Sequence, residues 1–133
     1  MTAGRCLCEK IQVEFDTPPL DANYCHCSLC RRMTGSAFGA YGKFPEADLA
    51  VRSGEDSLRS FAVTGKMTMH FCGGCGTMLY TTHEDYPGFV YVSLGILDGG
   101  DELQPTCHEW VGSKAPWYEI HDDLPQFGEW SNQ

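Results

Sequence analysis

Cysteine is the residue type with the clearest chemical potential in this chain, because seven of its eight copies fall into three short clusters. The clusters contain Cys6 and Cys8, then Cys25, Cys27 and Cys30, then Cys72 and Cys75. Thiolates at such spacings are typical ligands of zinc, which prefers four ligands in a tetrahedral arrangement. In a reducing compartment, closely spaced cysteines indicate metal binding rather than disulfides.

The first and third clusters predict one closed site with four thiolates. Cys72-Gly-Gly-Cys75-Gly has the form of a zinc knuckle, in which glycines supply the positive φ angles of a tight turn. Cys6 and Cys8 are alternate residues, so on an extended strand both sulfurs face the same side. We therefore expect a structural zinc that joins the N-terminus to a distant hairpin. Reduced core cysteines, or four disulfides, are the alternatives.

The middle cluster predicts a different kind of site. Cys25, Cys27 and Cys30 offer three thiolates from one short loop, which leaves a tetrahedral metal one open position. Water, a substrate thiolate or a further side chain can fill it, and His70, His108 and Cys107 are the candidates within the chain. A side-chain ligand would make the metal structural. An open position on a thiolate-rich metal favours a fourth sulfur, and therefore predicts thiol chemistry at Cys25, Cys27 and Cys30.

Charged side chains near the middle cluster are candidates for substrate contacts. Arg31 and Arg32 follow it directly and can hold the carboxylates of a small ligand, although solvated surface charge is an equal interpretation. Asp98 and Glu109 are possible acids or bases that only the fold can place. We expect the interleaved His26 to point away from the thiolates.

The bulk properties exclude several classes of protein. The length of 133 residues favours a single domain that spans residues 1–133. The net charge of −9 argues against nucleic acid or anionic membranes as partners. The N-terminus shows no signal peptide, and the longest apolar run, 89–97, is too short to span a bilayer. We expect a soluble cytoplasmic protein, and a homodimer is compatible with an exposed sheet edge.

The apolar pattern predicts a mainly β protein. A helical turn is expected at 28–33, and the tail from 110 to 130 is expected to wrap across the surface and cover a sheet edge. The segment 89–94 is apolar at nearly every position, which indicates a central strand. Strands are expected at 11–15, 36–44, 49–51, 58–63, 67–71, 77–82 and 89–94.

Three motifs together resemble the glutathione-dependent formaldehyde-activating (Gfa) family, which shares a domain with centromere protein V. Gly4-Arg-Cys-Leu-Cys8 resembles the family's opening, the segment 25–38 resembles its Cys-His-Cys-x-x-Cys-Arg-x-x-Thr-Gly-x-x-Phe core, and 71–76 resembles its Phe-Cys-x-x-Cys-Gly. Pro105, His108, Trp110 and the segment 113–117 extend the likeness. Glu9 is a departure, since the family often has glycine there.

The resemblance implies small β-sheets arranged like a tent, with zinc-ribbon-like features. It implies two zinc ions: a structural ion at Cys6, Cys8, Cys72 and Cys75, and a second, more labile ion at Cys25, Cys27 and Cys30, where a thiol such as glutathione binds. The expected activity is that of a carbon–sulfur lyase or synthase, which forms or cleaves an S-hydroxymethyl adduct of the thiol and formaldehyde. The alternatives are a thiol carrier without catalysis and a structural two-zinc interaction module.

Overall fold

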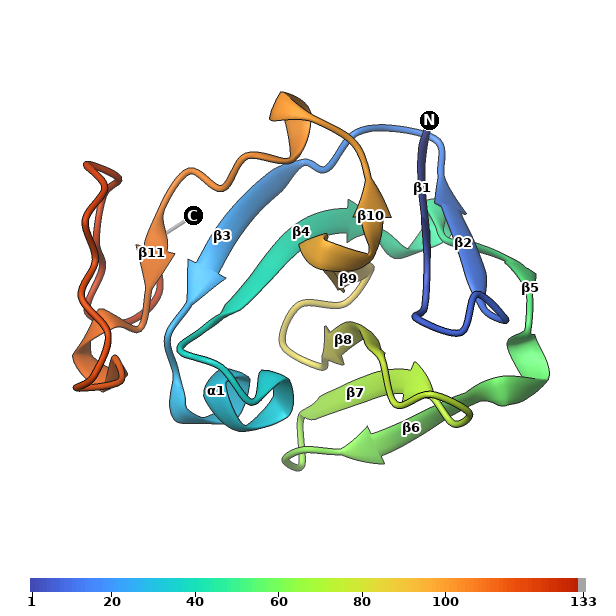
Figure 1. Cartoon of the computed structure of the whole chain (residues 1–133), viewed down its shortest axis with the longest axis horizontal. Helices are drawn as coiled ribbons and strands as arrows, with labels where there is room; N and C mark the ends of the chain where they lie inside the picture. The colour runs from blue at the N-terminus through green and yellow to red at the C-terminus, as the bar shows by residue number, and fades with distance from the viewer. Residues whose placement is uncertain (132–133) are drawn as a thin grey trace.

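The computed structural model describes residues 1–131 and shows a mainly β architecture, which confirms the expected fold class. The described residues form two sheets and one α-helix, α1 (Ser28–Thr34) (Figure 1). In spatial order, the first sheet contains β10 (Leu97–Asp98), β1 (Thr2–Arg5), β2 (Gln12–Phe15) and β5 (Ala50–Ser53). The second contains β11 (His108–Glu109), β3 (Asp21–Cys25), β4 (Gly39–Pro45), β9 (Phe89–Ser93), β8 (Met78–His83), β7 (Met67–Cys72) and β6 (Leu58–Ala62).

Short 3₁₀ helices connect several of these strands. They are η1 (Glu46–Asp48), η2 (Glu55–Ser57), η3 (Leu94–Ile96), η4 (Asp101–Leu103) and η5 (Val111–Ser113). None of the helices in the part of the chain that the structure describes is long and apolar enough to cross a membrane.

The hydrophobic core contains residues from both sheets. Phe15 of β2 stacks on Phe44 of β4, with ring centroids 4.0 Å apart, and both side chains are fully buried. Val90 and Val92 of β9 and Leu79 of β8 belong to the same cluster. The strand β9 is fourth of seven in its sheet, which confirms the expectation that the apolar segment near 89–94 is central.

All seven expected strands are present within a few residues, but four strands were not expected. The most important of these is β3, whose sequence Asp-Ala-Asn-Tyr-Cys lacks the large apolar residues that indicate a strand. It pairs antiparallel with β4 and parallel with β11. Strands β10 and β11 have two residues each, too few to produce a readable period, and β1 (Thr-Ala-Gly-Arg) contains no large apolar residue.

The C-terminal tail covers the β11 edge of the large sheet, as expected (Figure 1). His108 forms a parallel bridge with Gln126, and the Trp110 and Val111 N–H groups donate to the Glu129 and Phe127 carbonyl groups. The tail therefore provides backbone partners for a strand that would otherwise end the sheet with unpaired groups.

The segment from Cys6 to Glu9 corrects one expectation. Cys6 and Cys8 do not lie on an extended strand but in the turn between β1 and β2, where the Glu9 N–H donates to the Cys6 carbonyl group at 3.0 Å. Glu9 has a φ of 64°, in the left-handed region that costs a residue with a Cβ about 1 kcal/mol or more. The departure from glycine noted in the sequence thus falls on a position whose backbone favours glycine.

We expect Glu9→Gly to stabilise the protein by about 1 kcal/mol, since glycine adopts positive φ without a steric penalty. The ion pair that Glu9 makes with Arg5 is exposed, at 3.4 Å, and contributes little. Urea unfolding of the metal-loaded protein measures the change. Glu9→Ala is the matched control, because it removes the same carboxylate and keeps the Cβ. Equal effects of the two substitutions would contradict this account.

Candidate functional site

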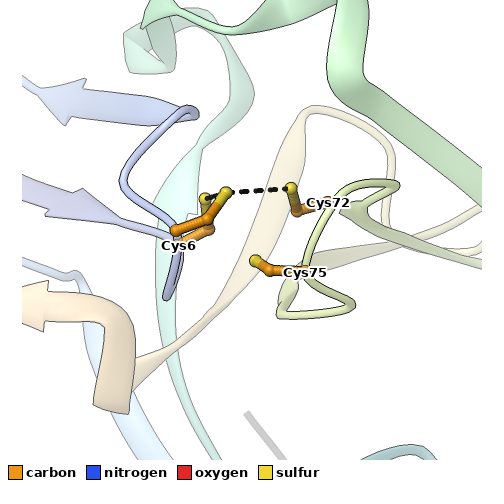
Figure 2. Close-up of side chains that lie close together, drawn as sticks. Cys6, Cys72 and Cys75 are labelled. Atoms are coloured by element: carbon orange, nitrogen blue, oxygen red, sulfur yellow. Dashed lines mark hydrogen bonds between the residues drawn. The ribbon is translucent and has the colours of Figure 1, made fainter.

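The first cysteine group is formed by two turns that face each other across the sheets. Cys6 and Cys8 come from the β1–β2 turn, whereas Cys72 ends β7 and Cys75 lies in the turn that follows it, before β8. Figure 2 shows the Cys6, Cys72 and Cys75 side chains converging from these two turns. The four sulfurs all lie within 4.8 Å of one another.

The spacing of these sulfurs fits a tetrahedral ion. Cys6 Sγ lies 3.5 Å from Cys8 Sγ, and Cys8 Sγ lies 3.8 Å from Cys72 Sγ. Two thiolates bound at about 2.3 Å to a tetrahedral zinc are about 3.8 Å apart. In each turn a backbone N–H donates to a sulfur, from Ile11 to Cys6 at 3.4 Å and from Gly74 to Cys72 at 3.3 Å. The residues present therefore fit a fully ligated metal.

Thr77 links the two turns and was not identified from the sequence. Its hydroxyl lies 3.2 Å from Cys75 Sγ and accepts a hydrogen bond from the Leu7 N–H at 3.0 Å. Hydrogen bonding from the side chain and backbone of Thr77 lowers the pKa of Cys75 to about 5. A thiol with a lowered pKa is already a thiolate at neutral pH, which is the form that binds metal.

The second group contains Cys25 at the end of β3 and Cys27 and Cys30 at the start of α1, again with sulfurs within 4.8 Å. Cys27 is the N-cap of the helix, and its sulfur accepts a hydrogen bond from the Cys30 N–H at 3.3 Å. Cys30 lies one turn further along, so its side chain is on the same helical face as Cys27. Local helix geometry therefore brings two of the three sulfurs together.

The second group is arranged so that one thiolate is strongly favoured. Hydrogen bonds from the Cys25 and Cys30 thiols lower the pKa of Cys27 to about 3. Hydrogen bonding to Cys27 and then to Cys30 raises the pKa of Cys25, because the three sulfurs share one negative charge in the absence of a cation. A divalent cation would allow all three to be thiolates.

The side chains considered as a fourth ligand lie outside this group. His70 stacks on Tyr80 and contacts the Thr82 hydroxyl at 3.2 Å, while Cys107 is buried elsewhere. Within residues 1–131, the group contains the three cysteines alone. The group thus offers a metal ion three sulfur ligands, rather than a closed set of four.

His108 has another partner, which explains why it is not in the group. His26 Nε2 lies 2.8 Å from His108 Nδ1, and His108 Nε2 lies 2.9 Å from the Asp122 carboxylate. The carboxylate can only accept, so His108 donates from Nε2 and accepts at Nδ1 from His26. Burial, followed by the nearby His108, lowers the pKa of His26 to about 4. His26 points away from the thiolates, as expected from the sequence.

A cavity of about 170 Å³ opens beside the second group. Cys25 and Cys30 form part of its wall, and the rest comes from one face of the seven-stranded sheet, from α1 and from the tail. The lining residues are Asp21, Ala22, Asn23, Cys25, Cys30, Met33, Tyr41, Lys43, Met67, Thr81, His83, Tyr86, Tyr91, Glu109, Trp130 and Ser131. Neither Arg31, which is partly buried, nor Arg32, which is exposed, is among them.

Tyr41 is a further residue of the cavity wall. Its ring lies across Gly39, the register partner of Cys25, where a Cβ would meet the ring carbons at 2.6 Å. Its hydroxyl is buried without a hydrogen-bond partner among the described atoms. Burial and the neighbouring Cys30 sulfur raise the pKa of Tyr41, so the hydroxyl stays protonated. The protonated hydroxyl is thus a donor beside the Cys30 sulfur.

Glu109 also lines the cavity, while Asp98 is exposed on β10 of the other sheet. The two carboxyl groups that the sequence could not distinguish are therefore separated by the fold. Only Glu109 lies beside the cysteines, as the register partner of Cys25.

Two curated proteins are similar to this chain over most of its length. A protein of Halomonas elongata that carries the formaldehyde-activating family name is 26% identical over 124 residues, covering 88% of this chain and 79% of the relative. A Penicillium rubens protein of the same family name is 27% identical over 107 residues, covering 75% of this chain and 56% of the relative.

A crystal structure of a Rhodobacter sphaeroides protein matches the fold with a TM-score of 0.61 at 26% identity. The match covers 74% of this chain and 90% of that one. The model of the family described as glutathione-dependent formaldehyde-activating enzyme matches residues 1–113. The chain therefore belongs to the glutathione-dependent formaldehyde-activating enzyme family.

Proposed function

We propose that this protein catalyses the reversible addition of a small thiol such as glutathione to formaldehyde, at a zinc ion held by Cys25, Cys27 and Cys30. The observation that carries the proposal is the opening of a three-cysteine group onto a cavity. A second zinc at Cys6, Cys8, Cys72 and Cys75 has a structural role. Zinc at the open site supplies a position for a fourth sulfur and favours the thiolate form of a bound thiol.

The reaction requires no oxidant or reductant. The thiol loses its proton to solvent, its sulfur forms a bond with the carbonyl carbon, and the carbon–oxygen π bond breaks. The resulting oxygen anion takes up a proton, so that thiol and formaldehyde combine into one S-hydroxymethyl adduct. The chain contributes by holding the two reactants together and by supplying a proton donor, two effects that accelerate such additions.

Tyr41 has the properties of that donor. The residue lines the cavity, and burial together with the nearby Cys30 sulfur raises the pKa of its hydroxyl, which therefore stays protonated beside the cysteine group. A donor placed where charge develops stabilises the transition state more than the reactants. A hydrogen bond from this hydroxyl to the developing oxygen anion would therefore favour the addition.

The metal assignment predicts two zinc ions per chain after purification without chelator, measured by elemental mass spectrometry. Cys75→Ser should remove the structural ion and lower the thermal unfolding midpoint, because structural zinc contributes folding free energy directly. Cys107→Ala is the matched control, since Cys107 is a buried cysteine outside both groups. Unchanged zinc content in Cys75→Ser would contradict the assignment.

Cys27→Ser tests the catalytic site. Serine is a poor zinc ligand, so we expect this variant to retain one zinc and to lose the acceleration of adduct formation over buffer. Nuclear magnetic resonance of ¹³C-formaldehyde with the thiol measures the rate. The proposal is wrong if zinc content and rate both stay at wild-type values. Saturable thiol binding by the wild-type protein without any acceleration would indicate a carrier instead.

Tyr41→Phe tests the proton donor separately from the metal. We expect the rate of adduct formation to fall by about 10- to 100-fold, near the low end of general acid effects. Zinc content and the dissociation constant of the thiol should stay unchanged, because phenylalanine retains the ring that lies over Gly39. A loss of zinc, or a change in thiol affinity equal to the loss of rate, would assign Tyr41 a structural role.

A further inference from the structure

Polar side chains of β3 line the cavity at increasing distances from the cysteine group. Asp21, Asn23 and Cys25 alternate along the strand and all line the cavity, as expected for residues on one face of a sheet. At about 3.3 Å per residue, Asn23 lies roughly 7 Å from Cys25 along the strand and Asp21 roughly 13 Å. A ligand with its sulfur at the cysteine group would meet the Asn23 position first and Asp21 later.

Glu109 lies beside Asn23, the nearer of these two polar residues. It is 5% exposed, and its carboxylate accepts hydrogen bonds from the Asn23 side-chain amide and, at 2.9 Å, from the Ser131 N–H. Both donors are neutral, and no ion pair to Glu109 is present among the residues that the structure describes. A buried carboxylate without a cation is costly, unless a ligand supplies the opposite charge.

The surroundings of Glu109 favour a cation over an anion. Tyr86, Tyr91 and Trp130 line the same cavity, and the Tyr86 and Trp130 rings are 6.2 Å apart in a T-shaped contact. Aromatic rings combined with a carboxylate form the kind of pocket that binds ammonium groups. Lys43 pairs in register with Asp21, at the far end, and its Nζ lies 4.2 Å over the Phe89 ring. Its charge is therefore directed away from Glu109.

The size of the cavity limits what enters it. A volume of about 170 Å³ is similar to that of an engineered cavity of roughly 150 Å³ that binds benzene. Such a space holds one end of a small thiol and not an entire tripeptide. The group that enters must then match Glu109 and the aromatic wall, while the rest of the ligand stays near the opening.

We propose that this cavity binds the primary ammonium group of the thiol substrate, with Glu109 as its anionic partner and Tyr86, Tyr91 and Trp130 as its wall. This inference rests on the proposed function for the identity of the ligand as a thiol. The ammonium belongs to the γ-glutamyl end of glutathione or to a simple aminothiol. Both offer a protonated amine on the same molecule as the sulfur, separated from it by two carbons in the aminothiol and by a longer chain in glutathione.

The test compares two ligands that differ only at the amine. S-methylglutathione carries the ammonium, whereas its N-acetyl derivative does not, and neither has a free thiol. Calorimetry with the zinc-loaded protein should show that N-acetylation weakens binding by about tenfold or more, as expected for loss of a charged hydrogen bond. Equal affinities, or no binding of S-methylglutathione, would overturn the inference.

Glu109→Gln assigns the effect to the residue. Glutamine has nearly the same shape and can keep both neighbours if the Asn23 amide rotates. This variant should bind S-methylglutathione as weakly as the wild-type protein binds the N-acetyl derivative, and should bind the derivative with wild-type affinity. Equal weakening of both ligands would show a structural role. Glu119→Gln, at an 82% exposed side chain, is the matched control. If Glu109→Gln fails to fold, the two-ligand comparison on the wild-type protein decides alone.

The outcome is separable from that of the proposed function. The S-methyl ligands cannot form a thiolate, so their binding does not depend on zinc chemistry. Amine-dependent binding without any acceleration of adduct formation would support the inference and refute the activity. Acceleration without amine dependence would do the reverse. A second pair of ligands, 2-aminoethanethiol and 2-mercaptoethanol, also differs by an amine. If the affinity ratio of this pair equals that of S-methylglutathione and its N-acetyl derivative, a simple aminothiol is sufficient for recognition.

Discussion

The convergence of two tight turns at Cys6, Cys8, Cys72 and Cys75 is the constraint on which the rest of the structure depends. One turn belongs to the four-stranded sheet and the other to the seven-stranded sheet, so the four sulfurs meet where two separate sheets come together. Thr77 reinforces the connection through its contacts with Cys75 and with the Leu7 N–H. A metal ion bound by these sulfurs would give a small β protein with short strands a link that a larger hydrophobic core would otherwise provide.

The second constraint is the hydrogen-bonded series of His26, His108 and Asp122. His26 sits between two cysteines of the open group, while His108 begins β11, so their 2.8 Å contact joins the cysteine loop to the strand that carries Glu109. Tyr24 and His108 stack at 4.8 Å on the same side. Neither histidine belongs to the group of three sulfurs that could bind a metal ion. Their effect is to keep β11, and therefore Glu109, next to Cys25 in the parallel pair.

The predictability of the site differed between residue types. Cysteine clusters were predictable because their spacing alone limits which sulfurs can meet, and the structure brings together the same two sets. The turn at Cys6 was misread as a strand because Cys-x-Cys fits both, and only the positive φ of Glu9 distinguishes them. The strand β3 was missed because its cavity-facing positions hold Asp21 and Asn23, which lack the apolar alternation that indicates a strand.

The roles of Tyr41 and Glu109 could not be derived from the sequence for a related reason. Tyr41 looks like an ordinary core aromatic, and only the strand register shows that its ring crosses Gly39 beside Cys25. Glu109 lies 84 residues from Cys25 in sequence, and a two-residue parallel strand gives no periodic signal. The local features of the chain thus reveal the metal ligands, whereas the groups that would contact substrate depend on long-range strand pairing.

The contrast between the two cysteine groups suggests why the chain keeps both. Four thiolates fill every coordination position of a tetrahedral ion and leave none for a substrate, whereas three thiolates leave one position open. In this fold the closed set lies between the sheets, and the open set lies at the end of β3, where the sheet face forms a cavity. The open set could not hold its geometry alone, since Cys25 ends a strand, Cys27 caps a helix of seven residues and Cys30 lies within that helix. Its position is fixed by β4 and β11 on either side of β3, and those strands are held in turn by the core and the C-terminal tail.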